Sequence, residues 1–94
     1  MALRTYDYDT ALLLRDEADI LAYLDAVLAE NDPALLAAAL GDIARAKGMT
    51  KISKETGLGR ESLYKALSDT GNPSFSTIQK VLASFGFRLK VVPV

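Results

Sequence analysis

Two short helical patterns lie back to back in the stretch MTKISKETGLGRESLYKAL, residues 49–67. Two helices that cross at a tight turn need particular residue types at fixed offsets, because their backbones approach closely. Ser53 is small enough for the crossing, and Gly57 can adopt the positive φ of the turn without steric cost. The inward positions are then Ile52, Leu58, Leu63, Ala66 and Leu67. The spacing predicts two helices at roughly 90 to 120° to each other, a helix-turn-helix.

Three further helices are predicted around this motif. Apolar residues recur with helical spacing from residue 16 to about residue 30, and they predict the first. Asp32 as N-cap and Pro33 as first helical residue open the second, and Ser74 caps the third, which Gly86 ends. The apolar stripe of the first helix is assigned to the protein's own core and consists of Ile20, Leu21, Leu24, Val27 and Leu28.

The C-terminal stretch FRLKVV, residues 87–92, changes to the two-residue alternation of a half-buried strand. Residues 5–8 are a candidate partner strand, and residues 10–14 predict one or two helical turns. The expected fold is all-α, a compact bundle of about five helices with a short C-terminal β-strand. The whole chain, 1–94, is expected to be one domain, with an acidic arm and helix in 1–32, the helix-turn-helix core in 33–86 and the strand in 87–94.

Composition argues against catalysis and for binding. The chain contains no Cys and no His, so it lacks the commonest general base and the commonest transition-metal ligand. We expect no enzyme activity, no cofactor and no metal site. No apolar run approaches the roughly 18 residues of a membrane span, and the N-terminus lacks a signal peptide, so a cytoplasmic protein is expected.

The formal net charge of −1 hides two opposite ends. Residues 1–32 contain two basic and eight acidic side chains, a charge of −6, whereas residues 33–94 contain nine basic and four acidic side chains, a charge of +5. The basic part includes the outward side of the second short helix, where Arg can bind guanine and Glu can accept from cytosine. The candidate DNA-binding residues are Thr50, Lys51, Arg60, Glu61, Ser62, Tyr64, Lys65 and Asn72. Of these, Thr50, Lys51 and Asn72 suit phosphates.

Other interpretations of the same residues remain open. The two short helices could be a solvated hairpin in any small bundle. Lys54, Ser62 and Lys65 have the spacing of a serine–lysine pair, but nothing in the sequence predicts a pocket around them. The carboxylates of residues 16–19 could be taken for a metal site, although helix capping explains them more simply. Tyr6 and Tyr8 could form a recognition arm or dock on the core.

Residues 32–92, from DPALLAAALGDIARAKG to FGFRLKVV, closely resemble the helix-turn-helix addiction-module antidote proteins, and the upstream DYDTALLLRDEADILAYLDAVLAENDP fits their N-terminal region. These are antitoxins with a Cro/phage-repressor (XRE-like) DNA-binding fold. Two residues depart from the family pattern, since Gly59 stands where Ser usually caps the recognition helix and Ser53 where Ala is usual. A Gly cap costs only a few tenths of a kcal/mol relative to Ser, so we expect the fold to be kept.

The resemblance implies a type II antitoxin that neutralises a small RelE-like toxin, typically a ribosome-dependent mRNA endonuclease, and represses its own operon. Such a toxin is expected to be basic, and the acidic first third of the chain suits it. The candidate toxin-binding residues are Tyr6, Asp7, Tyr8, Asp9, Leu13, Asp16, Glu17, Asp19 and Tyr23, together with Asp25.

A homodimer is expected, because pairing of FRLKVV with a second copy would cover a strand edge and allow a palindromic operator to be bound. Pairing within the chain, with residues 5–8, is the alternative. Two other functions remain open, a phage-type repressor without a toxin partner and an interaction bundle that binds no nucleic acid.

Overall fold

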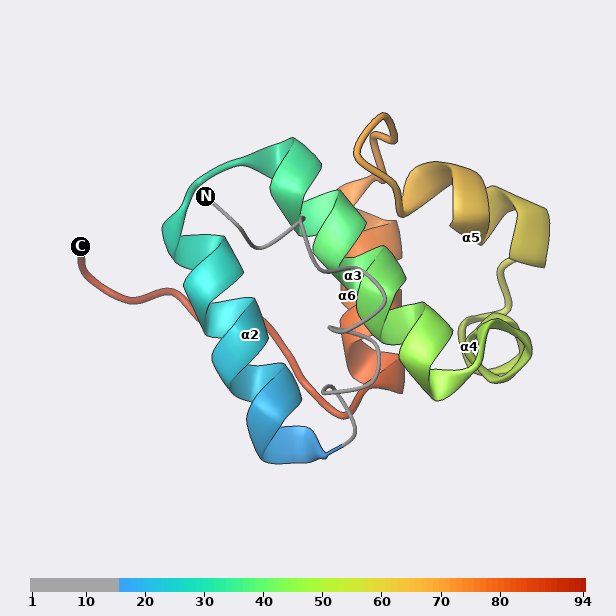
Figure 1. Ribbon diagram of the computed structural model, residues 1–94, viewed down its shortest axis with the longest axis horizontal. Helices are drawn as coiled ribbons and strands as arrows, with labels where there is room; N and C mark the ends of the chain where they lie inside the picture. Colours follow the sequence, from blue (N-terminus) through green and yellow to red (C-terminus); the bar gives the residue numbers. More distant parts are fainter. Residues whose placement is uncertain (1–15) are drawn as a thin grey trace.

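Five helices make up the regular structure of residues 16–94, the part of the chain that the computed structural model describes (Figure 1). They are α2 (Glu17–Ala29), α3 (Pro33–Lys47), α4 (Met49–Thr56), α5 (Arg60–Ala66) and α6 (Phe75–Ser84). The prediction of a helical fold with about five helices is confirmed for these residues.

Side-chain caps set the starts of three helices. Asp16 Oδ1 accepts a hydrogen bond from the backbone N–H three residues later at 2.9 Å, and Ser74 Oγ does the same at 3.1 Å. Asp32 accepts from the N–H groups of residues 34 and 35, and Pro33 follows it as the first residue of α3. The predicted caps Asp32 and Ser74 are confirmed, and Asp16 caps α2, as the capping alternative to a metal site predicts.

α6 ends in a Schellman motif, in which two backbone N–H groups beyond the helix bond back to its last turn. Gly86 has a φ of 90° and donates to the carbonyl of Ala83 at 3.0 Å, while Phe87 donates to the carbonyl of Leu82 at 2.9 Å. Gly86 is therefore the left-handed stop that was predicted. The motif turns the chain back so that Phe87 and Leu89 pack against the core.

Residues 87–94 contain no strand, which corrects the prediction of a C-terminal β-strand. The predicted alternation is present in the side chains, because Phe87 and Leu89 are half-buried while Arg88 and Lys90 are exposed. A strand also needs a ladder of hydrogen bonds to a neighbouring strand, and no segment of residues 16–94 supplies one. The candidate partner, residues 5–8, lies outside the described residues, as do the helical turns predicted for 10–14.

α3 is the central helix, and between Ala37 and Ala44 it is buried on every side. α2, α4 and α5 all contact it, and α6 packs against α4 (Figure 1). A helix segment buried all round is expected to be apolar, and seven of these eight residues are; four are Ala, and Leu40 and Ile43 reach into the core. Small side chains let the neighbouring helices approach α3 from several directions at once.

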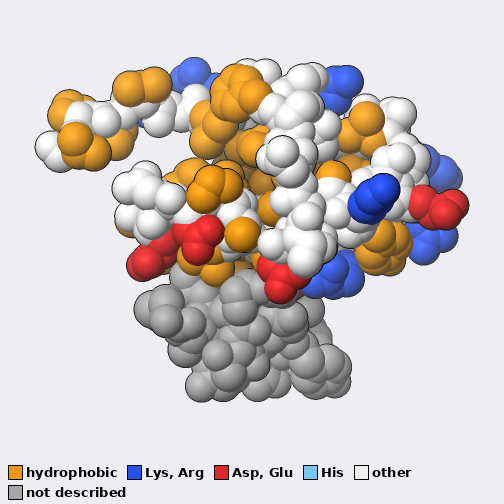
Figure 2. All heavy atoms as spheres, turned by 90° about the horizontal axis from the view of Figure 1, so that it is seen from above, with side chains coloured by type: hydrophobic (Ala, Val, Ile, Leu, Met, Phe, Trp, Pro, Cys, Tyr) orange, Lys and Arg blue, Asp and Glu red, His pale blue; other side chains and the backbone are white. Residues whose placement is uncertain are grey.

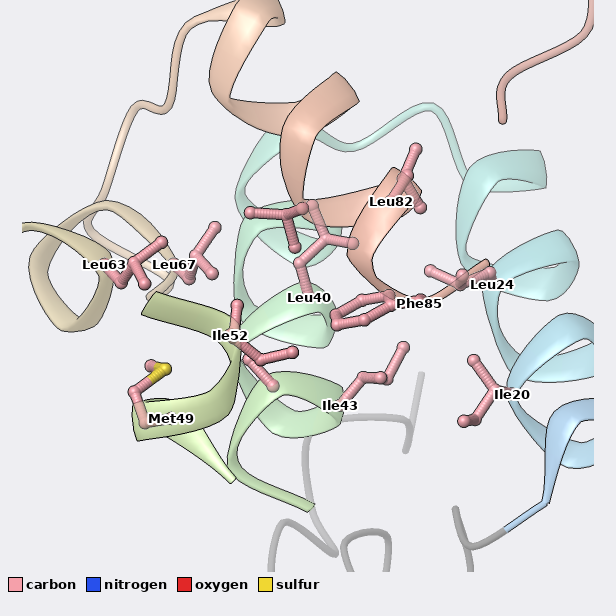
Figure 3. Close-up of a cluster of buried hydrophobic side chains, with 12 residues drawn as sticks. Ile20, Leu24, Leu40, Ile43, Met49, Ile52, Leu63, Leu67, Leu82 and Phe85 are labelled. Atoms are coloured by element: carbon pink, nitrogen blue, oxygen red, sulfur yellow. The ribbon is translucent and has the colours of Figure 1, made fainter. Parts of the chain in front are cut away.

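The core is formed by large apolar side chains from all five helices. Figure 3 shows Leu40 and Ile43 of α3 between the side chains of α2 on one side and those of α4 and α5 on the other. The buried cluster consists of Ile20, Leu24, Leu40, Ile43, Ala44, Met49, Ile52, Leu63, Leu67, Val81, Leu82 and Phe85. The three inward positions Ile52, Leu63 and Leu67 of the predicted motif are therefore confirmed.

The prediction that the whole apolar stripe of α2 belongs to the core is only partly correct. Ile20, Leu24 and Val27 are buried, but Leu21 is 56% exposed and Leu28 is 38% exposed. Each of these leucines follows a buried residue in the sequence, and consecutive helical residues point about 100° apart. The packing partners of α2 cover one side of it, so that the leucines at the edge of the stripe stay in contact with solvent.

Gly41 permits a close contact between α3 and the end of α5. A Cβ atom at this position would lie 2.1 Å from the carbonyl oxygen of Leu67, a separation that real Cβ atoms do not show. Glycine in a helix interior is unfavourable relative to alanine by about 1 kcal/mol. The contact with the backbone of Leu67 explains why glycine nevertheless stands in the middle of this helix.

We expect Gly41→Ala to lower the free energy of unfolding by about 2 kcal/mol, because overpacking outweighs the better helix propensity of alanine. Urea denaturation measured by circular dichroism checks this. Ala46→Gly, at an exposed position of the same helix, is the control and should lose about 0.5–1 kcal/mol through propensity alone. An increase in stability for Gly41→Ala would contradict the close approach.

Candidate functional site

The turn between α4 and α5 is held by its own side chains. Gly57 has a φ of 75°, as predicted, and its N–H donates to the carbonyl of Ser53 at 2.9 Å. The hydroxyl of Ser53 donates to the carbonyl of Leu58 at 2.5 Å, and the N–H of Leu58 donates to the hydroxyl of Thr56 at 3.2 Å. Ser53 is therefore more than a small residue at a crossing, because its hydroxyl satisfies a carbonyl of the turn.

α5 has one buried side and one exposed side. Leu63 and, just beyond the helix, Leu67 are buried, and Leu58 in the turn packs against the same core. The opposite side presents only candidate DNA-binding residues, all of them exposed: Arg60, Glu61, Ser62, Tyr64 and Lys65. The structure therefore brings five of the eight candidates together on one short helix.

Arg60 and Tyr64 interact along this exposed side. The guanidinium carbon of Arg60 lies 5.9 Å from the centre of the Tyr64 ring, within the range of a cation–π contact. The ring limits the directions in which the guanidinium can point, and it leaves the edges of that group available for hydrogen bonds. Sequence spacing places the two residues four apart, a separation that brings side chains together on a helix.

The three candidate phosphate ligands are all exposed. Thr50 and Lys51 lie in the first turn of α4, whose N-cap Gly48 makes no side-chain hydrogen bond to the backbone N–H groups of that turn. Asn72 lies in the loop between α5 and α6. First-turn N–H groups and the helix dipole favour an anion at such a position.

Acidic side chains predominate on one part of the surface and basic side chains on another. In Figure 2, blue Lys and Arg side chains gather on the right, which is the side of α4 and α5 in Figure 1. Residues 16–32, which contain α2, carry six carboxylates and no Lys or Arg. The acidic and basic parts of the sequence therefore lie on different helices of the fold.

The candidate toxin-binding residues of the first third divide into three groups. Asp16, Glu17 and Asp19 are exposed, and so is Asp25. Tyr23 is not on the outer surface, where a toxin-binding residue would lie: it is half-buried against the core, and its hydroxyl donates to Asp42 Oδ2 at 3.3 Å. The remaining candidates lie outside the described residues and are Tyr6, Asp7, Tyr8, Asp9 and Leu13.

Asp42 is a buried carboxylate that the sequence analysis did not single out. It is 1% exposed, and Arg45 contacts its Oδ1 at 2.6 Å while Tyr23 contacts Oδ2. Burial of a charge is costly unless it is paired and hydrogen-bonded, so these contacts are what allow it within α3. The sequence pattern that could have predicted this ion pair is an Asp in the middle of an otherwise apolar helix, followed three residues later by an Arg.

The described residues give no support to the alternative interpretations of a serine–lysine pair or a metal site. Lys54, Ser62 and Lys65 are all exposed, so no buried environment activates the serine. Within residues 16–94, no group of three or more His, Cys, Asp or Glu side chains is arranged to hold a metal ion. No helix of these residues is long and apolar enough to cross a membrane.

A model of the family described as probable addiction module antidote proteins matches residues 4–93. The chain belongs to this family. An uncharacterized protein of Haemophilus influenzae (strain ATCC 51907 / DSM 11121 / KW20 / Rd) is 46% identical over 85 residues, 90% of this chain and 88% of that protein. No solved structure matches the chain. The predicted resemblance to the antidotes is confirmed, and the family indicates an antitoxin role with a toxin partner.

Gly59 of this antidote is the N-cap of α5 and supplies no side-chain cap. Its φ of −65° and ψ of 145° suit any residue, and a Cβ atom there would meet only Ser62 Oγ at 3.9 Å. Gly59→Ser should therefore raise the free energy of unfolding by about 0.5–1 kcal/mol, through a new cap and a less flexible unfolded chain. Thermal and urea denaturation measure this, with Gly59→Ala as the control that adds Cβ without a cap. Equal stabilities of the Ser and Ala variants would show that no cap forms.

Proposed function

We propose that this antidote binds a RelE-like toxin directly and represses its own operon by sequence-specific DNA binding through α4 and α5, acting in the cytoplasm. The exposed side of α5 is the main support for the proposed DNA binding. Five polar or aromatic side chains stand there, while the other side of the helix is committed to the core. A short helix that presents such side chains on a basic surface has what base recognition requires.

In this proposal α4 and α5 are a helix-turn-helix of the Cro/phage-repressor type. α5 enters the major groove, where Arg60 donates two hydrogen bonds to a guanine and Glu61 accepts from a cytosine. Tyr64 supports the guanidinium of Arg60 from one face. Thr50, Lys51 and Asn72 bind phosphates and thereby set the position of α5 along the groove.

The toxin part of the proposal rests on the family and on charge. The antidote family implies a toxin partner. A toxin that acts on mRNA should be basic, and the carboxylates of residues 1–32 would attract it. We assign its contact to residues 6–14 and to the exposed acidic residues of α2, so that DNA and toxin bind different helices.

The C-terminal residues support a homodimer. Val91, Val92 and Val94 are largely exposed, beside a groove of about 500 Å³ whose walls include Phe75, Leu82 and Leu89. Extended apolar residues without a neighbouring strand can be covered by the same residues of a second copy, in two-fold symmetry. Such a dimer would present two copies of α5 to a palindromic operator.

Replacing Arg60 by Ala tests DNA recognition. Binding to the operator upstream of the antidote's own gene should weaken by about 1–3 kcal/mol, roughly 5- to 150-fold, with little change on random DNA. Fluorescence anisotropy on both DNAs measures this. Lys80→Ala removes the same charge from an exposed position of α6 and is the control. Equal losses on the two DNAs would make Arg60 a phosphate ligand, and no loss would refute the helix-turn-helix proposal.

Removal of residues 91–94 tests the homodimer. Truncation after Lys90 deletes the exposed valines but keeps Phe87 and Leu89, which pack on the core, so the fold should be retained. We expect the dimer dissociation constant to rise about tenfold or more, a change of about 1.4 kcal/mol. Sedimentation equilibrium at micromolar concentration measures it. A full-length monomer, or a truncated chain that dimerises as before, would refute this arrangement.

A further inference from the structure

An apolar and acidic ridge runs along the outside of α2. Leu21 and Leu28 are the exposed leucines of this helix, and Glu17 and Asp25 stand four residues before and after Leu21. Residues three, four, seven and eleven apart share one side of a helix, so these four side chains form a continuous line. We call Glu17, Leu21, Asp25 and Leu28 the α2 ridge.

The ridge ends at a hollow of about 300 Å³ between α2 and α3. Its walls are formed by Val27, Leu28, Asn31, Asp32, Pro33 and Leu36. Asn31 has a φ of 54°, a left-handed conformation in which the chain turns from α2 into α3 beside this hollow. The hollow is large enough to receive an apolar side chain, and it lies directly next to an exposed leucine.

Charge decides which partner this surface fits. Residues 16–32 contain six carboxylates and no Lys or Arg, so phosphate groups of nucleic acid would be repelled from it. A second copy bound in two-fold symmetry would bring carboxylates against carboxylates, which is unfavourable. Residues 1–15 contain two basic and two acidic side chains and offer no net opposite charge. The partner surface that fits the ridge therefore has apolar side chains flanked by Lys or Arg.

We propose that the α2 ridge is the docking surface for the toxin, and that the toxin meets it with apolar side chains, one of them in the hollow, flanked by basic residues. This inference rests on the proposed direct binding of a toxin by the antidote. The exposed leucines supply burial of apolar area at the centre, and Glu17 and Asp25 pair with cations at the rim. The interface thus differs from the contact expected from the sequence, which assigned Leu21 and Leu28 to the core.

The first test removes the apolar centre of the ridge. Leu21→Ser/Leu28→Ser in the full chain should weaken binding to the toxin, purified as the product of the adjacent reading frame, by about thirtyfold or more in calorimetry. Phe75→Ser/Val92→Ser removes two apolar side chains of similar exposure elsewhere, 61% and 64%, and should change toxin affinity less than about threefold. Unchanged circular dichroism spectra and thermal unfolding verify that both variants are folded. Leu21→Met/Leu28→Met should restore the affinity.

The second test reverses the charge of the ridge. Glu17→Lys/Asp25→Lys should lower the association rate with the toxin about tenfold and reduce its dependence on salt, as stopped-flow fluorescence would measure. Glu55→Lys/Asp69→Lys changes the same charge at two exposed positions outside α2 and is the matched control. Equal effects of the two pairs would overturn the assignment to the ridge.

Three outcomes distinguish the inference from its rivals. Toxin affinity that survives Leu21→Ser/Leu28→Ser, while the wild type binds, overturns the ridge but leaves direct toxin binding intact. An effect of the leucine variants that disappears once residues 1–14 are deleted would show that the ridge holds the chain's own N-terminal segment, which also overturns it. A wild-type chain that binds no toxin overturns both this inference and the proposed function.

Discussion

The middle of α3 is buried on every side, and this burial determines how the other helices pack. Half of the residues in its buried middle are Ala, and Gly41 stands where the backbone of Leu67 comes closest, so three helices can pack against it at short distance. One buried position is charged, and Arg45 and Tyr23 compensate Asp42 there. Because Tyr23 comes from α2, this polar contact also joins the acidic helix to the centre of the fold.

Packing around α3 separates two surfaces of different character. α2 lies on one side of it and α4 and α5 lie on the other (Figure 1). The basic side presents the polar residues of α5, and the acidic side presents carboxylates beside exposed leucines. Under the proposed function, the operator and the toxin would not compete for the same helix, and each would meet the charge that attracts it.

Features governed by neighbouring residues were predictable from the sequence. Asp32, Pro33, Ser74, Gly57 and Gly86 act as caps, starts and stops through hydrogen bonds or φ values within their own turn, so their roles do not depend on the remainder of the chain. The exposed side of α5 was predictable for a related reason. Once Leu63 and Leu67 are known to be buried, helical periodicity leaves Glu61, Tyr64 and Lys65 outside. Arg60 is exposed as the first residue of α5.

Periodicity alone could not say how much of an apolar stripe is covered. Leu21 and Leu28 belong to the stripe of α2 by spacing, but the neighbours of α2 reach only Ile20, Leu24 and Val27. The same limit applies to Tyr23, which turned inward because Asp42 of another helix offers its carboxylate. It applies to residues 87–92 as well, whose alternation is real although no strand within residues 16–94 pairs with them.

The helices, their ends, the tight turn and the opposed charges of the two ends could thus be derived from the amino-acid sequence, because each follows from interactions over a few residues or from simple counting. The exposure of the α2 leucines, the burial of Asp42 and the need for Gly41 arose from the assembled fold. They depend on which surfaces of distant helices come into contact, and that is set by packing around α3, where residues far apart in sequence must fill one volume.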